Sequence, residues 1–307
     1  MSALERRIRV GSAPCSWGVL DGFDLSQAPG YAQVLDGMAE TGYEGTEYGD
    51  PGFMPDDADL LRRELAARSL TMIGAFVPAT LADPVAHAPA LSLALRTARL
   101  LAACAAPDDR PFVVLADDPC SDPVRLKCAG RIQQEQGLTA EQWRTLARGA
   151  DSIARAVRDE TGLRTVFHHH SGSFVETPSE IETLLDITAP DLIGLCLDTG
   201  HYIYGGGDAL DALKRFGGRV WHVHFKDCPQ PVLDRARAEG WDYLQAVAGG
   251  LFCELGTGLV DFPSLMSELE RLDYRGWIVV EDEFPPGTRV AEDSARRDRE
   301  FLKTLGL

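Results

Sequence analysis

The histidines of this sequence gather where β-strands are expected to end. Six of the seven lie in the second half of the 307-residue chain, in the stretches FHHHSG, LDTGH and VWHVHFKD. Side chains of an extended strand alternate between two faces, so His168 and His170 share a face of one strand, and His222 and His224 share a face of another. Neighbouring imidazoles bind metal ions or transfer protons near neutral pH. These positions therefore indicate a polar site built on strand ends.

Two carboxylates follow apolar runs in the same way. Asp198 ends LIGLCLD, and Glu281 ends GWIVVE. A buried carboxylate costs free energy unless it is paired or binds a metal ion. Each residue alone could have a structural role, such as capping a helix. Together with a fifth-strand histidine and His224, however, the two carboxylates end four consecutive strands, which favours one shared site. We therefore expect a divalent ion, of the Mn, Co, Fe or Zn type rather than Ca, bound by Asp198, His224, Glu281 and a fifth-strand histidine such as His168.

The elements that must position these residues follow a regular alternation. Longer helical patterns such as AEQWRTLARGADSIARAVRDETG and TPSEIETLLD separate short β-rich runs. A doubly wound open sheet needs the same alternation, but eight runs with polar residues ending the last four favour a closed barrel. The sequence predicts an α/β protein, a (β/α)8 TIM barrel forming a single domain over 1–307. The expected strands are 8–13, 42–48, 70–77, 111–116, 164–169, 192–197, 219–225 and 276–281.

Two stretches interrupt this rhythm, at about 117–138 after the fourth expected strand and at about 227–260 after the seventh. Both follow a strand, so both lie on the C-terminal face, where barrel enzymes build their sites. Connections this long are usually functional or disordered. We interpret them as candidate lids over the site.

The composition excludes several classes of protein. The formal charge of -17 opposes binding to a phosphate backbone, which argues against a nucleic-acid partner. No apolar run approaches the roughly 20 residues that span a bilayer, and the N-terminus lacks the pattern of a secretory signal. We therefore expect no membrane partner and a cytoplasmic location. Seven cysteines without a CxxC pair, Cys120 among them, fit reduced thiols better than a disulfide framework.

The same stretches resemble a known family. GTEYG, HHHSG, DTGHYIYGGGDAL, RVWHVHFKD and DFPSLMSELERLDYRGWIVVEDE are similar to motifs of the xylose isomerase-like barrel superfamily. Within it, they most resemble the inosose dehydratases, which are lyases of myo-inositol catabolism. The resemblance is strong from about residue 164 onward, whereas only SAPCSWG and GYEGTEYG carry it earlier in the chain.

This resemblance implies a single Mn or Co ion, with Zn, Fe or Mg as alternatives, bound by Asp198, His224 and Glu281. Many relatives supply a fourth ligand, a Glu, from the fifth strand. His168 stands at that place here, so the fourth ligand stays open. The other residues that match the family's site positions are Glu47, His170, His201 and Lys226 as catalytic candidates, the last three also as substrate contacts, and Trp17 as an aromatic that stacks on the substrate.

The expected reaction is dehydration of a cyclic polyhydroxy ketone, an inosose. A divalent ion that polarises the ketone lowers the barrier to removing the adjacent proton, which leaves the substrate as an enolate. The β-hydroxyl then leaves as water. Reprotonation of the same enolate gives an epimerase or isomerase acting on a keto-sugar, which is the first alternative. An apurinic-site endonuclease shares the barrel but needs a basic surface, and a polyol-binding sensor is a further alternative. The resemblance also implies a homodimer or homotetramer.

Overall fold

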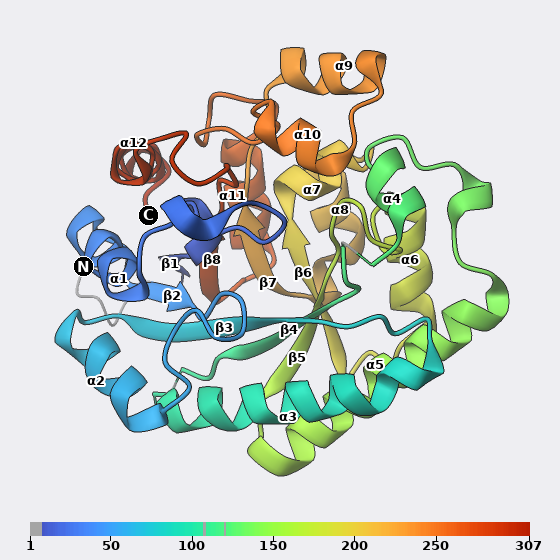
Figure 1. Ribbon diagram of the computed structural model, residues 1–307, viewed down its shortest axis with the longest axis horizontal. Helices are drawn as coiled ribbons and strands as arrows, with labels where there is room; N and C mark the ends of the chain where they lie inside the picture. The colour runs from blue at the N-terminus through green and yellow to red at the C-terminus, as the bar shows by residue number, and fades with distance from the viewer. Residues whose placement is uncertain (1–7, 107–108, 120) are drawn as a thin grey trace.

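The computed structural model describes residues 8–106, 109–119 and 121–307; the first seven residues and Cys120 lie outside them. Eight parallel strands pair in chain order and close on themselves, so the predicted (β/α)8 barrel is confirmed (Figure 1). No helix within the described ranges is long and apolar enough to cross a membrane. The strands are β1 (Ile8–Ser12), β2 (Gly45–Glu47), β3 (Thr71–Pro78), β4 (Phe112–Ala116), β5 (Arg164–His168), β6 (Ile193–Asp198), β7 (Val220–Phe225) and β8 (Gly276–Val280).

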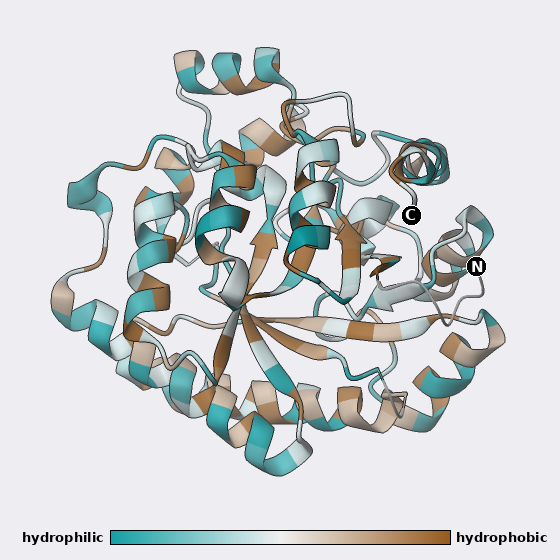
Figure 2. Ribbon diagram, turned by 180° about the vertical axis from the view of Figure 1, so that it is seen from behind, coloured by the Kyte–Doolittle hydropathy of each residue, from teal (hydrophilic) through white to brown (hydrophobic). Residues whose placement is uncertain are grey.

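Helices surround the barrel and turn their apolar sides toward it, while hydrophilic residues face outward (Figure 2). Capping residues set the ends of two of these helices: Thr177 and Glu180 form a capping box that begins α6, and Gly162 ends α5 in a left-handed conformation. The helices are α1 (Tyr31–Thr41), α2 (Ala58–Ala67), α3 (His87–Cys104), α4 (Pro123–Cys128), α5 (Ala140–Thr161), α6 (Pro178–Ile187), α7 (Thr199–Tyr204), α8 (Ala209–Phe216), α9 (Gln230–Glu239), α10 (Tyr243–Ala248), α11 (Phe262–Arg271) and α12 (Ala291–Thr304).

The second strand is shorter than the predicted run 42–48. Gly42 belongs to the end of α1, where its φ of 89°, its N–H bond to the Ala39 carbonyl and the N–H bond of Tyr43 to the Met38 carbonyl close the helix. The pairing of β2 with β3 also shifts register between Thr46 and Glu47. This irregularity ends the strand at Glu47, whose buried side chain takes part in the site.

The two long connections are folded segments with fixed supports. α4 lies in the first, and its fully buried Arg125 forms two hydrogen bonds with Glu180, of 2.8 and 2.9 Å, at the start of α6. α9 and α10 occupy the second and stand with α4 at the top of Figure 1. Behind them, Asp227 accepts backbone N–H bonds from Gly256, Gly258 and Val260, which fixes the end of that segment. Asp118 and Tyr243, one from each connection, line the pocket described below.

Replacing Arg125 by Ala is expected to lower the free energy of unfolding by about 3–5 kcal/mol, because the Glu180 carboxylate would stay in a protein interior without its partner. Urea unfolding followed by circular dichroism measures this change. Arg235 pairs with Glu239 at 2.9 Å on the exposed face of α9, so Arg235→Ala serves as the control and should cost less than about 1 kcal/mol. Equal losses in the two variants would contradict a supporting role for the buried pair.

Candidate metal-binding active site

A pocket of about 140 Å³ opens at the C-terminal ends of the strands. Its floor is polar and comes from strands that are far apart in the sequence, because a barrel brings all its strand ends together. Three acids, Asp21, Asp50 and Asp118, lie in the loops around it. The imidazoles and carboxylates that line the pocket are those of Glu47, His168, His170, His224, Glu281 and Glu283.

Four side chains that the sequence suggested as metal ligands meet at this floor. One donor atom of each of His168, Asp198, His224 and Glu281 lies within 4.8 Å of the others, and all four residues are buried. Asp198 Oδ2 is 3.8 Å from His168 Nε2 and 3.8 Å from His224 Nδ1, while His224 Nδ1 is 3.1 Å from Glu281 Oε1. The end of β6 places Asp198 beside His224 of β7 in the strand register.

These donors fit a divalent ion. Asp198 Oδ2 and His224 Nδ1 are both buried and make no well-formed hydrogen bond within the described residues, although Lys226 Nζ lies 3.3 Å from the first and Glu281 Oε1 lies 3.1 Å from the second. Such unsatisfied atoms are rare in protein interiors, and an ion between them would satisfy both. Two carboxylates and two imidazoles form the mixed oxygen and nitrogen set that suits Mn, Co, Fe or Zn.

A third carboxylate orients one of these imidazoles. Glu47 Oε1 lies 3.1 Å from Nε2 of His224 and 2.8 Å from Nε2 of His222. Burial opposes the charge on Glu47, but the two imidazoles outweigh burial and lower its pKa to about 2. A carboxylate accepts from Nε2–H, so when His224 is neutral, as a metal ligand must be, its lone pair is on Nδ1, the nitrogen that faces Asp198 and Glu281. Glu47 therefore positions His224, in addition to lining the pocket.

Replacing Glu47 by Gln should weaken the binding of Mn²⁺ by about 10–100-fold, the usual cost of losing an outer partner of a metal-binding histidine. Isothermal titration of the metal-free protein measures this change. Glu40→Gln on the exposed side of α1 is the matched control, with unchanged affinity expected. Equal Mn²⁺ affinity in Glu47→Gln and wild type would show that Glu47 does not support the ligand.

Lys226 and His201 lie behind the pocket floor. The ammonium group of Lys226 is 2.8 Å from Glu281, 2.5 Å from Glu283 and 2.9 Å from His201 Nε2. Burial lowers the pKa of Lys226, but the surrounding carboxylates outweigh it and hold that pKa well above its usual value. Both residues were expected to contact the substrate. The structure does not bring either one to the pocket wall, because their polar groups are engaged with each other and with the carboxylates.

Trp17 is also placed differently from the expectation. The chain turns sharply after β1 through Pro14–Trp17, which directs the indole away from the pocket and toward α1. There the ring packs so closely that a Cβ on Gly37 would lie 2.3 Å from it, and the indole N–H faces Ser12 Oγ at 3.3 Å. The side chain is only 2% exposed. Trp17 therefore lies among core residues and not among the residues that line the pocket.

Two further residues of the wall were not singled out from the sequence. Glu283 lines the pocket, accepts a short hydrogen bond from the hydroxyl of Tyr243 and lies 4.0 Å from His170 Nε2. Tyr243 begins α10 and also lines the pocket. His170 Nδ1 lies 2.8 Å from the carbonyl oxygen of Ser171, which only accepts. The His170 proton is therefore on Nδ1, and its Nε2 carries a lone pair.

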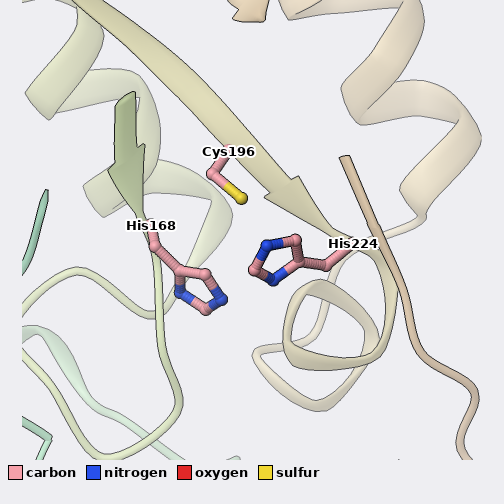
Figure 3. A group of neighbouring side chains, drawn as sticks. All are labelled: His168, Cys196 and His224. Atoms are coloured by element: carbon pink, nitrogen blue, oxygen red, sulfur yellow. The ribbon is translucent and has the colours of Figure 1, made fainter. Parts of the chain in front are cut away.

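Cys196 lies deeper in the barrel, beside His168 and His224 (Figure 3). Burial is the main reason that its pKa is raised to about 12. The thiol therefore stays protonated at neutral pH, and it lacks the thiolate character that a nucleophile requires.

A closed (β/α)8 barrel that gathers acids and imidazoles in a pocket at its C-terminal face defines an enzyme of the TIM-barrel class. The model of the xylose isomerase-like TIM barrel family matches residues 35–305, and the chain is an enzyme of that family.

Individual relatives agree with this membership. The chain is 33% identical to an inosose dehydratase of Geobacillus kaustophilus over 97% of its own length and 94% of the relative's. Among solved structures, a D-allulose 3-epimerase from Methylomonas in complex with D-allulose has 20% identity and a TM-score of 0.67, covering 97% of both chains. The IOLI protein with a binding zinc atom has 13% identity and a TM-score of 0.69, again over 97% of both chains. The likeness to these two structures concerns the fold.

Proposed function

We propose that this enzyme removes water from an uncharged cyclic polyhydroxy ketone of the inosose type and depends on one divalent ion. Mn²⁺ and Co²⁺ are the first candidates for this ion. The observation that carries the proposal is the four-donor cluster of His168, Asp198, His224 and Glu281, three of which line the pocket together with His170. The name of the full-length relative from Geobacillus kaustophilus supports the choice of reaction and substrate.

The four donors would hold the ion at the pocket floor. When bound, such an ion supplies Lewis-acid chemistry, which makes the hydrogen beside a ketone more acidic. The protein's own contribution is first to position the substrate. The substrate ring must lie between the pocket floor and His170 for a carbon-bound proton to come within reach of a base.

His170 is the residue best placed to move that proton. Its Nε2 lone pair is turned toward Glu283 at the pocket wall, and 12% of its side chain is exposed, whereas His201 is fully buried. We infer that Nε2 takes the proton next to the ketone and then returns it to the departing β-hydroxyl, which leaves as water. The carboxylate of Glu283 stabilises the imidazolium between these two transfers. One group positioned in this way contributes about 10²–10⁴-fold to the rate.

The charge of the pocket supports a neutral substrate. The described residues that line it include Asp21, Asp50 and Asp118 but no lysine or arginine. A phosphate or carboxylate on the substrate would meet these acids without a basic partner, and like charges repel strongly when they are partly desolvated. We therefore expect cyclic polyols with a ketone to be turned over and their phosphorylated or carboxylated counterparts to be rejected.

The test is to strip the purified protein of metal, add back Mn²⁺ or Co²⁺, and follow 2-keto-myo-inositol by mass spectrometry. Metal-dependent loss of one water supports the dehydratase. An unchanged mass with a new isomer would move the reaction to epimerisation or isomerisation, and no change with any metal would refute the proposed substrate. A phosphorylated inosose in a parallel assay tests the role of the acidic rim, and equal turnover of both compounds would contradict it.

A further inference from the structure

A second group of metal-binding side chains lies directly behind the first. His170, His201 and Glu283 each offer a donor atom within 4.8 Å of the others, and all three are buried. Glu283 Oε1 is 4.0 Å from His170 Nε2 and 3.4 Å from His201 Nε2. Two imidazole nitrogens and a carboxylate oxygen at these separations form a second donor set that could ligate a divalent ion.

Lys226 places its ammonium group between the two donor groups. The nitrogen lies 2.5 Å from Glu283 and 2.9 Å from His201 Nε2 on one side. On the other side it lies 2.8 Å from Glu281 and 3.3 Å from Asp198. An ammonium group only donates hydrogen bonds, so its contact with His201 uses the Nε2 lone pair of the tautomer whose Nδ1–H faces the Ser171 hydroxyl at 2.9 Å, and a metal ligand would use the same lone pair. Three carboxylates and one imidazole thus surround a single buried cation.

The fold keeps a place for this cation. A Cβ on Gly200 would lie 2.6 Å from Lys226 Cγ, so the absence of a side chain there makes room for the lysine stem. The ring of Phe252 covers the ammonium nitrogen at 4.7 Å from the ring centroid, a favourable position for a cation. The lysine side chain is fully buried, so water does not replace these contacts.

We propose that the ammonium group of Lys226 stands in place of a second divalent cation and thereby limits this enzyme to one ion. The inference rests on the metal site of the proposed function. With that ion bound, the charges of Asp198, Glu281 and Glu283 are balanced by one divalent ion and one ammonium group. Removing the ammonium group would leave an uncompensated negative charge beside three donors that are ready to bind a metal.

The experiment compares metal content in wild type and Lys226→Met, which is similar in length and uncharged. Both proteins are equilibrated with Mn²⁺, dialysed and analysed for metal per chain by mass spectrometry. We expect Lys226→Met to hold one more ion than wild type, and the two neighbouring Mn²⁺ ions to show magnetic coupling by electron paramagnetic resonance. Adding Glu283→Gln to Lys226→Met should return the content to the wild-type number, and Lys226→Arg should not change it.

An equal or smaller number of ions in folded Lys226→Met than in wild type would overturn the inference. Circular dichroism checks the fold, and Lys226→Gln replaces the Met variant if the latter does not fold. The wild-type count reports on the proposed function separately: zero ions in wild type refutes the first metal site, whereas the difference between variant and wild type tests only the role of Lys226.

Discussion

Asp198→Asn is expected to lose its bound metal ion and to lower kcat on the order of 10³-fold or more, because Lewis-acid stabilisation by such an ion amounts to several kcal/mol. Asp198 has two separate tasks. Its Oδ1 caps α7 by accepting the N–H of His201 at 2.8 Å, while its Oδ2 faces the metal ligands. Asn keeps an oxygen for the cap but removes the negative charge. The fold should therefore survive while the metal site fails.

The measurement is metal content after dialysis, together with turnover of 2-keto-myo-inositol and a thermal melt by circular dichroism. Asp208→Asn is the matched control, because Asp208 caps α8 in the same way through the N–H of Asp211 and does not line the pocket. It should keep both metal and activity. Wild-type metal content in Asp198→Asn would remove Asp198 from the ligand set and, with it, the basis of the proposed site.

Strand-end residues were predictable from the sequence because strand geometry is regular. Side chains alternate along β5 and β7, and a barrel closes all strand ends around one axis, so His168, Asp198, His224 and Glu281 had to converge once eight strands were recognised. Glu283 could have been found by the same rule. It follows Glu281 by two residues in VVEDE, and the alternation continues past the end of β8.

Residues outside the strands were harder to place. The direction of the Trp17 side chain depends on a single helical turn after β1. The sequence does not reveal that Gly37, which has no side chain, leaves space for the indole ring. Tyr243 reaches Glu283 from α10, forty positions earlier in the chain, without any local pattern that links the two. Lys226 and His201 lie near the site as expected. Their burial behind the pocket depends on the acceptors that surround the Lys226 ammonium group, and these come from several strand ends.

The long connections illustrate the same limit. Their length and their position after strands indicated functional segments, whereas the contacts that support them join residues that are distant in the sequence. Arg125 in α4 pairs with Glu180 of α6, and Glu176 accepts N–H bonds of 2.6 Å from both Gly130 and Gly172. No property of residues 117–138 alone specifies such partners.

His170→Gln is expected to lower kcat about 10²–10⁴-fold while metal content stays at the wild-type level, since His170 lies outside the first donor group. Glutamine has no basic lone pair, so it cannot accept the proton beside the ketone. The variant should therefore also lose the exchange of that proton with deuterium from the solvent. A purely structural change would instead lower the exchange rate only as far as it weakens substrate binding. Nuclear magnetic resonance of the substrate in deuterated buffer measures this exchange.

His87→Gln is the control for His170→Gln, because His87 begins α3 outside the barrel and its Nε2 lies 2.9 Å from the Leu81 carbonyl oxygen, away from the residues that line the pocket. It should keep both turnover and exchange. If His170→Gln stopped water loss but still exchanged the proton, His170 would be the acid for the leaving hydroxyl and another wall residue would be the base. Glu283 would then be the base, since Lys226 lowers its pKa despite burial and keeps it a carboxylate. Full turnover in His170→Gln would instead exclude the imidazole from proton transfer. Turnover and proton exchange, measured together, therefore separate the role of His170 from that of Glu283.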